Sequence, residues 1–144
     1  MALILIAGGV YYWWYNKDSE WKNISAGTLT FPKTAIAVEV ANTSELRKKG
    51  LGGRQGIDDK SGMLFIFDTL TKPDFWMKDM LFPIDIVFFD RNWNIVDIKE
   101  NFTPETYPEI YTPKVKAKYA VEVQSSFTKR FEVAVGDHVG FEPY

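Results

Sequence analysis

The chain of 144 residues lacks cysteine and contains a single histidine, His138. Without cysteine there can be no disulfide, thiolate metal site, cysteine nucleophile or lipid-modified cysteine. One histidine cannot supply the two or three imidazoles of a common zinc or iron site, so the residues predict no metal and no cofactor. The formal net charge is -2 and no basic patch is visible, which argues against nucleic acid as a partner.

Motifs for nucleophilic catalysis and for phosphate binding are also missing. A Ser–His–Asp triad would have to use His138, yet no Gly-x-Ser-x-Gly segment supplies the serine. The glycine-rich segment 51–60 lacks the Gly-Lys-Ser/Thr ending of a phosphate-binding loop. The paired acids Asp58 and Asp59 are interpreted as solvated loop charges. The sequence therefore leaves enzymatic activity open and favours a non-enzymatic module.

The N-terminus carries a long uncharged stretch, Ala2–Tyr15, which ends in five consecutive aromatic residues. As a helix this stretch would be about 21 Å long, against a hydrocarbon core of about 30 Å. The aromatic cluster is typical of a membrane interface. We expect residues 1–15 to form a hydrophobic anchor helix that contacts the membrane through residues 2–15, rather than a cleaved signal peptide, which would need a basic start and a small-residue cleavage site. A buried or disordered segment is the alternative.

A polar linker over residues 16–27 and one domain over residues 28–144 are expected to follow. Short apolar segments between turn residues predict strands, and the pattern around 42–50 and 125–130 predicts two short helices. The predicted strands are 28–31, 34–40, 63–67, 74–77, 84–89, 95–99 and 119–123. The predicted fold is mainly β, a compact sandwich or partly closed barrel with two short helices, preceded by the hydrophobic helix.

The densest apolar run, 61–90, contains two charged residues that ordinary core strands do not explain, Lys78 and Asp85. Trp76 and Lys78 are two positions apart and share one face of a strand. Asp85 shares its face with Val87 and Phe89, so its carboxylate needs a partner. One hypothesis pairs it with Lys78 across the intervening turn.

In that hypothesis Trp76, Lys78 and Asp85, with Met63 nearby and Arg54 from the preceding loop, line a pocket for a small polar or anionic ligand. The alternative is purely structural: Asp85 accepts hydrogen bonds from backbone amides at the Pro83 turn, and Lys78 extends over the edge of the domain.

Several segments together resemble the DUF192 family, small extracytoplasmic or membrane-anchored prokaryotic domains of unknown function. The matching segments, in order between residues 34 and 141, are Val38–Thr43, Glu45–Arg47, Gly50–Leu51, Gly62–Phe67, Phe75–Met80 and Pro83–Phe88, with looser matches at Val121–Val123 and Gly136–Val139. The resemblance implies a β-rich fold and a location outside the cytoplasm. It implies no activity.

Three functions are compatible with these observations. The first is a membrane-tethered extracytoplasmic module that binds a small polar ligand, a glycan or an envelope protein. The second is a cell-envelope hydrolase that uses carboxylates without a metal. The third is a structural or assembly protein. A pocket with perturbed titratable groups would favour the first two over the third.

Overall fold

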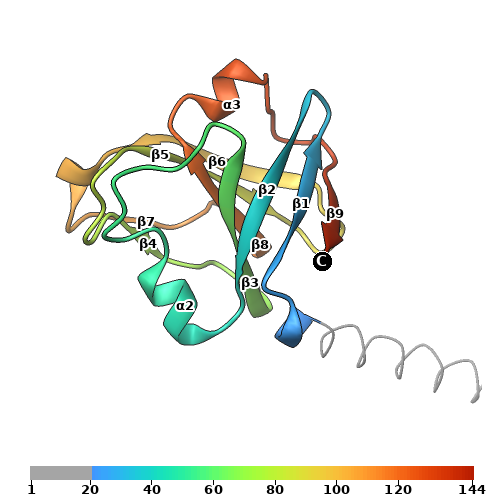
Figure 1. Ribbon diagram of the computed structural model, residues 1–144, viewed down its shortest axis with the longest axis horizontal. Helices are drawn as coiled ribbons and strands as arrows, with labels where there is room; N and C mark the ends of the chain where they lie inside the picture. Colours follow the sequence, from blue (N-terminus) through green and yellow to red (C-terminus); the bar gives the residue numbers. More distant parts are fainter. Residues whose placement is uncertain (1–20) are drawn as a thin grey trace, which may run out of the picture.

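The computed structural model describes residues 21–144, in which strands predominate (Figure 1). The elements are the 3-10 turns η1 (Trp21–Asn23) and η2 (Pro104–Thr106), the helices α2 (Ser44–Lys49) and α3 (Phe127–Arg130), and the strands β1 (Ala26–Phe31), β2 (Thr34–Ala41), β3 (Ser61–Thr71), β4 (Phe75–Trp76), β5 (Ile84–Phe89), β6 (Ile95–Phe102), β7 (Ile110–Tyr111), β8 (Ala117–Gln124) and β9 (Gly140–Pro143). The predicted anchor, residues 1–15, lies outside the described residues. Within residues 21–144, no helix has the length and apolar character needed to span a membrane.

Seven strands form one open mixed sheet in the order β6-β5-β8-β3-β2-β1-β9, and β4 and β7 form a separate two-stranded sheet. β2 and β3 run parallel, joined by the crossover that contains α2, and the other neighbours are antiparallel. This arrangement corrects the predicted sandwich or partly closed barrel. The short strand β9 pairs with β1 at one end of this order, and the chain before β9 meets the start of β6 through the bridge Asn94–His138 and backbone hydrogen bonds such as that from the Ile95 amide to the Asp137 carbonyl at 2.9 Å, without a continuous ladder.

The predicted strands and helices are present, with β5 found at the predicted residues 84–89. The helix predicted around residues 42–50 is α2, and Thr43 rather than Asn42 lies at its N-cap. Thr43 caps the helix by accepting a hydrogen bond from the Leu46 amide at 3.2 Å. Asn42 instead donates its side-chain amide to the Ile24 carbonyl at 3.0 Å, which ties the helix start to the chain before β1.

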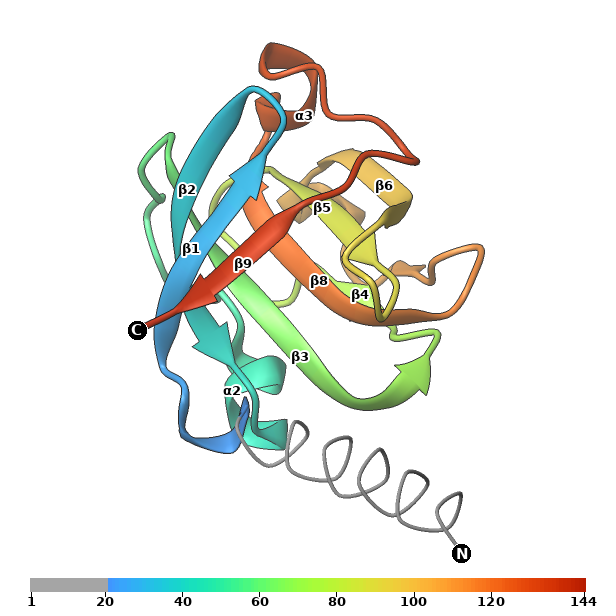
Figure 2. The same ribbon diagram turned by 90° about the vertical axis from the view of Figure 1, so that its right-hand side faces the viewer.

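Both faces of the sheet are covered, because alternate residues of the central strands point to opposite sides. On β5, Ile84, Ile86 and Phe88 pack on the side that α2 and β4 cover, which we call the α2 face. Val87 and Phe89 pack on the other side, which we call the β9 face. Figure 2 shows β9 next to β1, as expected for the edge strand that pairs with it. The separation of the two faces decides which side chains can meet in one site.

The chain between β6 and β8, which contains β7, is held by a buried carboxylate, Asp97 on β6. It accepts hydrogen bonds from the Tyr111 hydroxyl at 2.9 Å and from the Lys114 amide at 2.8 Å. Burial, the hydrogen bond to Asp97 and the charge of that carboxylate together raise the pKa of Tyr111 to about 12, with burial as the largest cause. The loop therefore presents β7 in a fixed position beside β4, with Phe75 opposite Tyr111 and Trp76 opposite Ile110.

Candidate functional site

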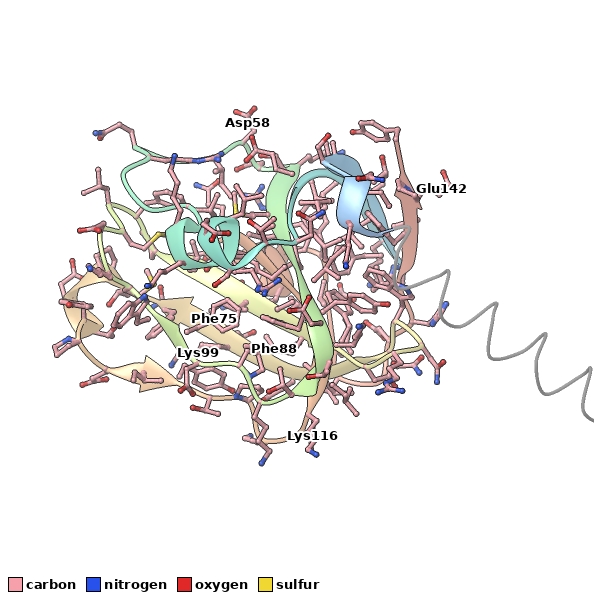
Figure 3. The ribbon with its side chains drawn as sticks, turned by 90° about the horizontal axis from the view of Figure 1, so that it is seen from below. Asp58, Phe75, Phe88, Lys99, Lys116 and Glu142 are labelled. Carbon is pink, nitrogen blue, oxygen red and sulfur yellow. The ribbon has the colours of Figure 1, made fainter. Side chains whose placement is uncertain are left out.

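A pocket of about 410 Å³ lies between α2 and β4, on the α2 face of the sheet. We call it the α2–β4 pocket. Residues of α2 and the two that follow it line one side, and side chains of β3 and β8 form the floor. The other side is lined by Asp74, Phe75, Trp76 and Lys78. Figure 3, drawn from below, shows Phe75 and Phe88 side by side next to α2. The pocket size falls within the range of small-molecule sites.

Aromatic rings form much of the wall and its support. The ring of Phe75 lies 5.2 Å from that of Phe65 and 5.4 Å from that of Phe88, both in edge-to-face geometry. Ala120 on β8 lies opposite both Phe65 and Phe88 in the sheet register. A small side chain there leaves room for the rings above the sheet, so the apolar wall is built on rigid strands.

One polar group lies at the floor of the pocket, the carboxyl group of Glu122 on β8. Its sheet neighbours are Met63 on β3 and Ile86 on β5, both apolar. The residue is 5% exposed, and within residues 21–144 no hydrogen-bond partner lies within reach of its Oε2 atom. An unpaired buried polar atom lowers the stability of the fold, because its hydrogen bonds to water are lost without replacement. This oxygen lines the pocket and is free to form a hydrogen bond with a ligand.

Burial raises the pKa of Glu122 to about 8. Hydrogen bonding from the Leu51 backbone and the charge of Arg54 act in the opposite direction but do not outweigh it. At neutral pH the side chain is therefore mostly a protonated acid, which can donate a hydrogen bond and exchange a proton near physiological pH.

Gly50 keeps space open above this carboxyl group. It ends α2 with a φ of 50° and a ψ of -137°, a conformation that favours glycine. A side-chain Cβ at this position would lie 3.5 Å from Glu122 Oε2 and 3.5 Å from the Phe65 ring. Gly50 thus adopts the backbone conformation that ends the helix and also leaves Glu122 accessible from the pocket.

The rim of the pocket is basic. Four cationic side chains line it, those of Arg47, Lys48, Lys49 and Lys78, against one other acidic residue, Asp74. The Arg47 guanidinium is fixed by a hydrogen bond to the Ile66 carbonyl at 2.8 Å and by Asp68 at 3.4 Å. The lysines are exposed and leave their ammonium groups available to solvent or to a ligand.

Trp76 forms the outer wall and is 43% exposed. The Lys78 ammonium lies 5.6 Å from its ring centroid, a cation–π distance, and the ring of Tyr107 lies 6.0 Å away. Beyond Trp76 and Lys78 a wider groove of about 790 Å³ continues past Gly53 and Leu81. The pocket therefore opens to solvent between an aromatic wall and basic side chains.

The structure brings together two of the five predicted site residues, Trp76 and Lys78, in this pocket. Met63 is buried in the core of the α2 face. Arg54 lines a different pocket and forms an ion pair with Glu39 at 2.7 Å.

Asp85 lies on the opposite face from Lys78, because its neighbours Ile84 and Ile86 occupy the α2 face. Its carboxylate is 1% exposed and accepts hydrogen bonds from the Asn101 amide at 2.9 Å and from the Thr128 amide and hydroxyl at 3.0 and 2.7 Å. Two of the three donors are backbone amides, as in the structural alternative, but all three belong to β6 and α3 rather than to the Pro83 turn. Asp85 joins three distant segments.

Sequence reasoning missed Glu122, although the signal was present. The segment Ala120–Val123 has one acid within an apolar strand, and the same criterion that selected Asp85 applies to it. Across residues 21–144, His, Asp and Glu side chains form no group of three that could hold a metal ion. The chemistry available here is that of one buried acid, aromatic walls and a basic rim.

Comparisons with known proteins agree with the resemblance found in the sequence. The model of the family DUF192, described as "Uncharacterized ACR", matches residues 27–141. A crystal structure from Sinorhizobium meliloti 1021, described as that of a proposed transcription regulator, is 27% identical with a TM-score of 0.74 and covers 81% of this chain and 92% of its own. A protein of unknown function from Novosphingobium aromaticivorans DSM 12444 is 25% identical with a TM-score of 0.73, covering 81% and 84%. No curated protein matches significantly.

Proposed function

Since the chain belongs to the DUF192 family, we propose a function for it from its own geometry: it is a binding module that takes a small ligand into the α2–β4 pocket. The observation that carries the proposal is the Glu122 carboxyl group, buried at the floor with one unpartnered oxygen among the described residues. The aromatic walls supply apolar contact area, and a hydrogen bond to this oxygen would fix the orientation of the ligand. This combination is typical of ligand sites. A purely structural role gives no reason for an open pocket above an unsatisfied acid.

Ligand mapping by NMR tests this proposal on the full chain. A set of planar aromatic acids, neutral compounds and amines would be screened for changes in backbone amide shifts. Binding in the pocket should move the signals of Gly50, Leu51, Trp76 and Glu122. Trp76→Ala should weaken every such hit, while Tyr144→Ala, which removes an exposed aromatic ring beside the separate Arg54 pocket, should not. Hits that change only the signals of other residues, or whose affinity is unchanged in Trp76→Ala, would contradict the proposal.

A hydrolase is the second candidate, because Glu122 and Asp74 line the same pocket and hydrolases of glycosides use two carboxyl groups. A raised pKa suits Glu122 to the role of general acid. Asp74 already accepts a hydrogen bond from the Thr112 hydroxyl at 2.5 Å. Turnover of an aryl glycoside that disappears in both Glu122→Gln and Asp74→Asn would establish this function in place of simple binding.

We further propose that residues 2–15 tether the binding module to a membrane, with the module outside the cytoplasm. The uncharged and aromatic composition of that segment supports the tether. The absence of cysteine makes the location directly testable, because Lys116→Cys introduces a single thiol at an exposed site. A membrane-impermeant maleimide should label this variant in intact cells and leave the wild-type chain unlabelled. Labelling only after lysis would refute an extracytoplasmic location.

A further inference from the structure

The charges around the α2–β4 pocket are distributed along its depth. The rim carries Arg47, Lys48, Lys49 and Lys78, with two carboxylates beside them: Asp74, which also lines the pocket, and Asp68, which pairs with Arg47 at 3.4 Å. The floor carries Glu122 between apolar neighbours on β3 and β5. A ligand that enters between α2 and β4 therefore meets positive charge first, then aromatic rings, and last a carboxyl group.

The positive rim discriminates among ligand charges. A cation has to pass four cationic side chains to reach Glu122, and at close range like charges repel even near a surface. An anion is attracted to the same groups. The rim thus favours a negatively charged ligand whose charge remains among the lysines, in contact with water.

The floor discriminates by hydrogen bonding. Between the rim and Glu122 the wall consists of the rings of Phe65, Phe75 and Trp76, which suit an apolar body. A protonated carboxyl group at the end of this body donates an O–H and needs an acceptor. In the part of the chain that the structure describes, Glu122 Oε2 has no such acceptor.

We propose that the α2–β4 pocket selects amphipathic organic anions, whose acidic group stays at the basic rim and whose apolar end carries a hydrogen-bond acceptor for the Glu122 carboxyl group. This inference rests on the proposed binding function and names its ligand class. No covalent step is involved: Glu122 keeps its proton and donates the hydrogen bond. Since the donor exists only in the protonated side chain, binding is linked to pH.

The groups that face Glu122 define the pH range in which this linkage operates. Met63 on β3 and Ile86 on β5 do not titrate. The charged groups are Arg54 from the loop after α2 and the rim residues named above, and the effect of burial exceeds that of Arg54. Affinity for the acceptor should therefore fall as pH rises through about 8.

Three matched probes separate the charge from the acceptor. The first is 6-acetyl-2-naphthoate, an anion with a carbonyl acceptor at the far end. The second is 6-isopropenyl-2-naphthoate, which has nearly the same shape but replaces the carbonyl oxygen with a CH₂ group. The third is the 6-acetyl compound with an aminomethyl group in place of the carboxylate. Each would be titrated into the full chain by calorimetry at pH 6.5 and pH 9.5.

We expect the acetyl acid to bind about fivefold more tightly than the isopropenyl acid at pH 6.5, the gain of one hydrogen bond, and to lose about tenfold in affinity at pH 9.5. Glu122→Gln keeps a donor at every pH, so the preference should persist at pH 9.5 in that variant. Glu122→Leu should bind both acids equally. The lysines are unchanged in the wild type and in both variants, so the effect of their titration on affinity is the same in all three proteins and cancels in the comparison.

The outcomes separate the two proposals. If both acids bind in the pocket with equal affinity, or if their pH dependence is unchanged in Glu122→Gln, the ligand class is wrong while the binding function stands. If the amine binds most tightly and its affinity rises with pH, the pocket is a cation site and the inference is overturned. If no probe binds and the screen gives no pocket hits, both proposals fail.

Discussion

The buried acid at the pocket floor makes a quantitative prediction about stability. Glu122 has a pKa of about 8 in the folded chain, raised by burial from an ordinary value of 4.5. The folded state therefore holds a proton between these two pH values that the unfolded state has released. Stability from this group is fully present below about pH 4.5 and is lost as pH rises through about 8.

The size of the effect follows from the same two values. The complete shift corresponds to about 5 kcal/mol, of which about 3 kcal/mol is lost between pH 6 and pH 9. Glu122→Gln keeps the shape and the hydrogen-bonding capacity of the protonated acid but cannot ionise. The free energy of unfolding of the wild-type chain should therefore fall by about 3 kcal/mol relative to this variant between pH 6 and pH 9.

Urea denaturation followed by tryptophan fluorescence measures this difference. With a denaturant slope of about 2 kcal/mol per molar, the two midpoints should move about 1.5 M relative to each other between pH 6 and pH 9. Glu142→Gln is the matched control, because it removes an exposed carboxylate on β9, far from Phe75 and α2 in Figure 3. Its profile should follow the wild type. Parallel profiles for Glu122→Gln and the wild type would show that Glu122 ionises normally, and the reasoning from burial would be refuted.

Three further substitutions test the structural groups. Asp85→Ala removes the acceptor of the Thr128 and Asn101 backbone amides, while the Thr128 hydroxyl keeps Glu100 as a partner at 3.1 Å, and should lower the free energy of unfolding by about 3 kcal/mol in urea titration, without changing probe binding in the α2–β4 pocket. Gly50→Ala forces a side chain into a φ of 50° and should cost about 1 to 2 kcal/mol, whereas Gly56→Ala, with open space around its Cβ, should cost less than about 0.5 kcal/mol in the same assay. Tyr111→Phe removes the hydrogen bond to Asp97 and should cost about 1 kcal/mol while speeding hydrogen exchange at Lys114; unchanged exchange there would show that this bond does not hold the loop.

Local patterns in the sequence were sufficient for individual elements. The apolar run of β5 and the capping and glycine signals of α2 identified both, since turn chemistry and side-chain alternation act over a few residues. Asn42 is an equally suitable capping residue by type, but Thr43 caps the helix, because the Asn42 side chain instead donates to Ile24, eighteen positions earlier. Such a partner is not visible in the local pattern.

The pairing of strands lay beyond local patterns, and with it the composition of the site. The parallel pairing of β2 with β3 and the placement of β8 between β3 and β5 depend on contacts between residues far apart in the chain. Trp76 and Lys78 share a pocket, although the strand ends at Trp76 and Lys78 lies in the turn that follows it. The sequence alone could not show that Asp85 and Lys78 lie on opposite faces of the sheet. That prediction requires knowing which face of β5 is covered by the chain around Lys78. Glu122 could have been recognised as a buried acid from its apolar neighbours, but not as the floor of a pocket.

The helix above the pocket has a consequence for how the site exchanges with solvent. α2 consists of six residues, none of which is buried. Its hold on the domain therefore comes from its ends, through Asn42 and Leu51, and from the Arg47 guanidinium, rather than from an apolar face. Elements with few buried contacts open locally at low free-energy cost, while central strands open only with the whole domain. Amides of α2 should thus exchange with deuterium well before those of β8. A ligand in the pocket should slow the exchange of the α2 amides selectively, so that their exchange rate indicates whether the pocket is occupied.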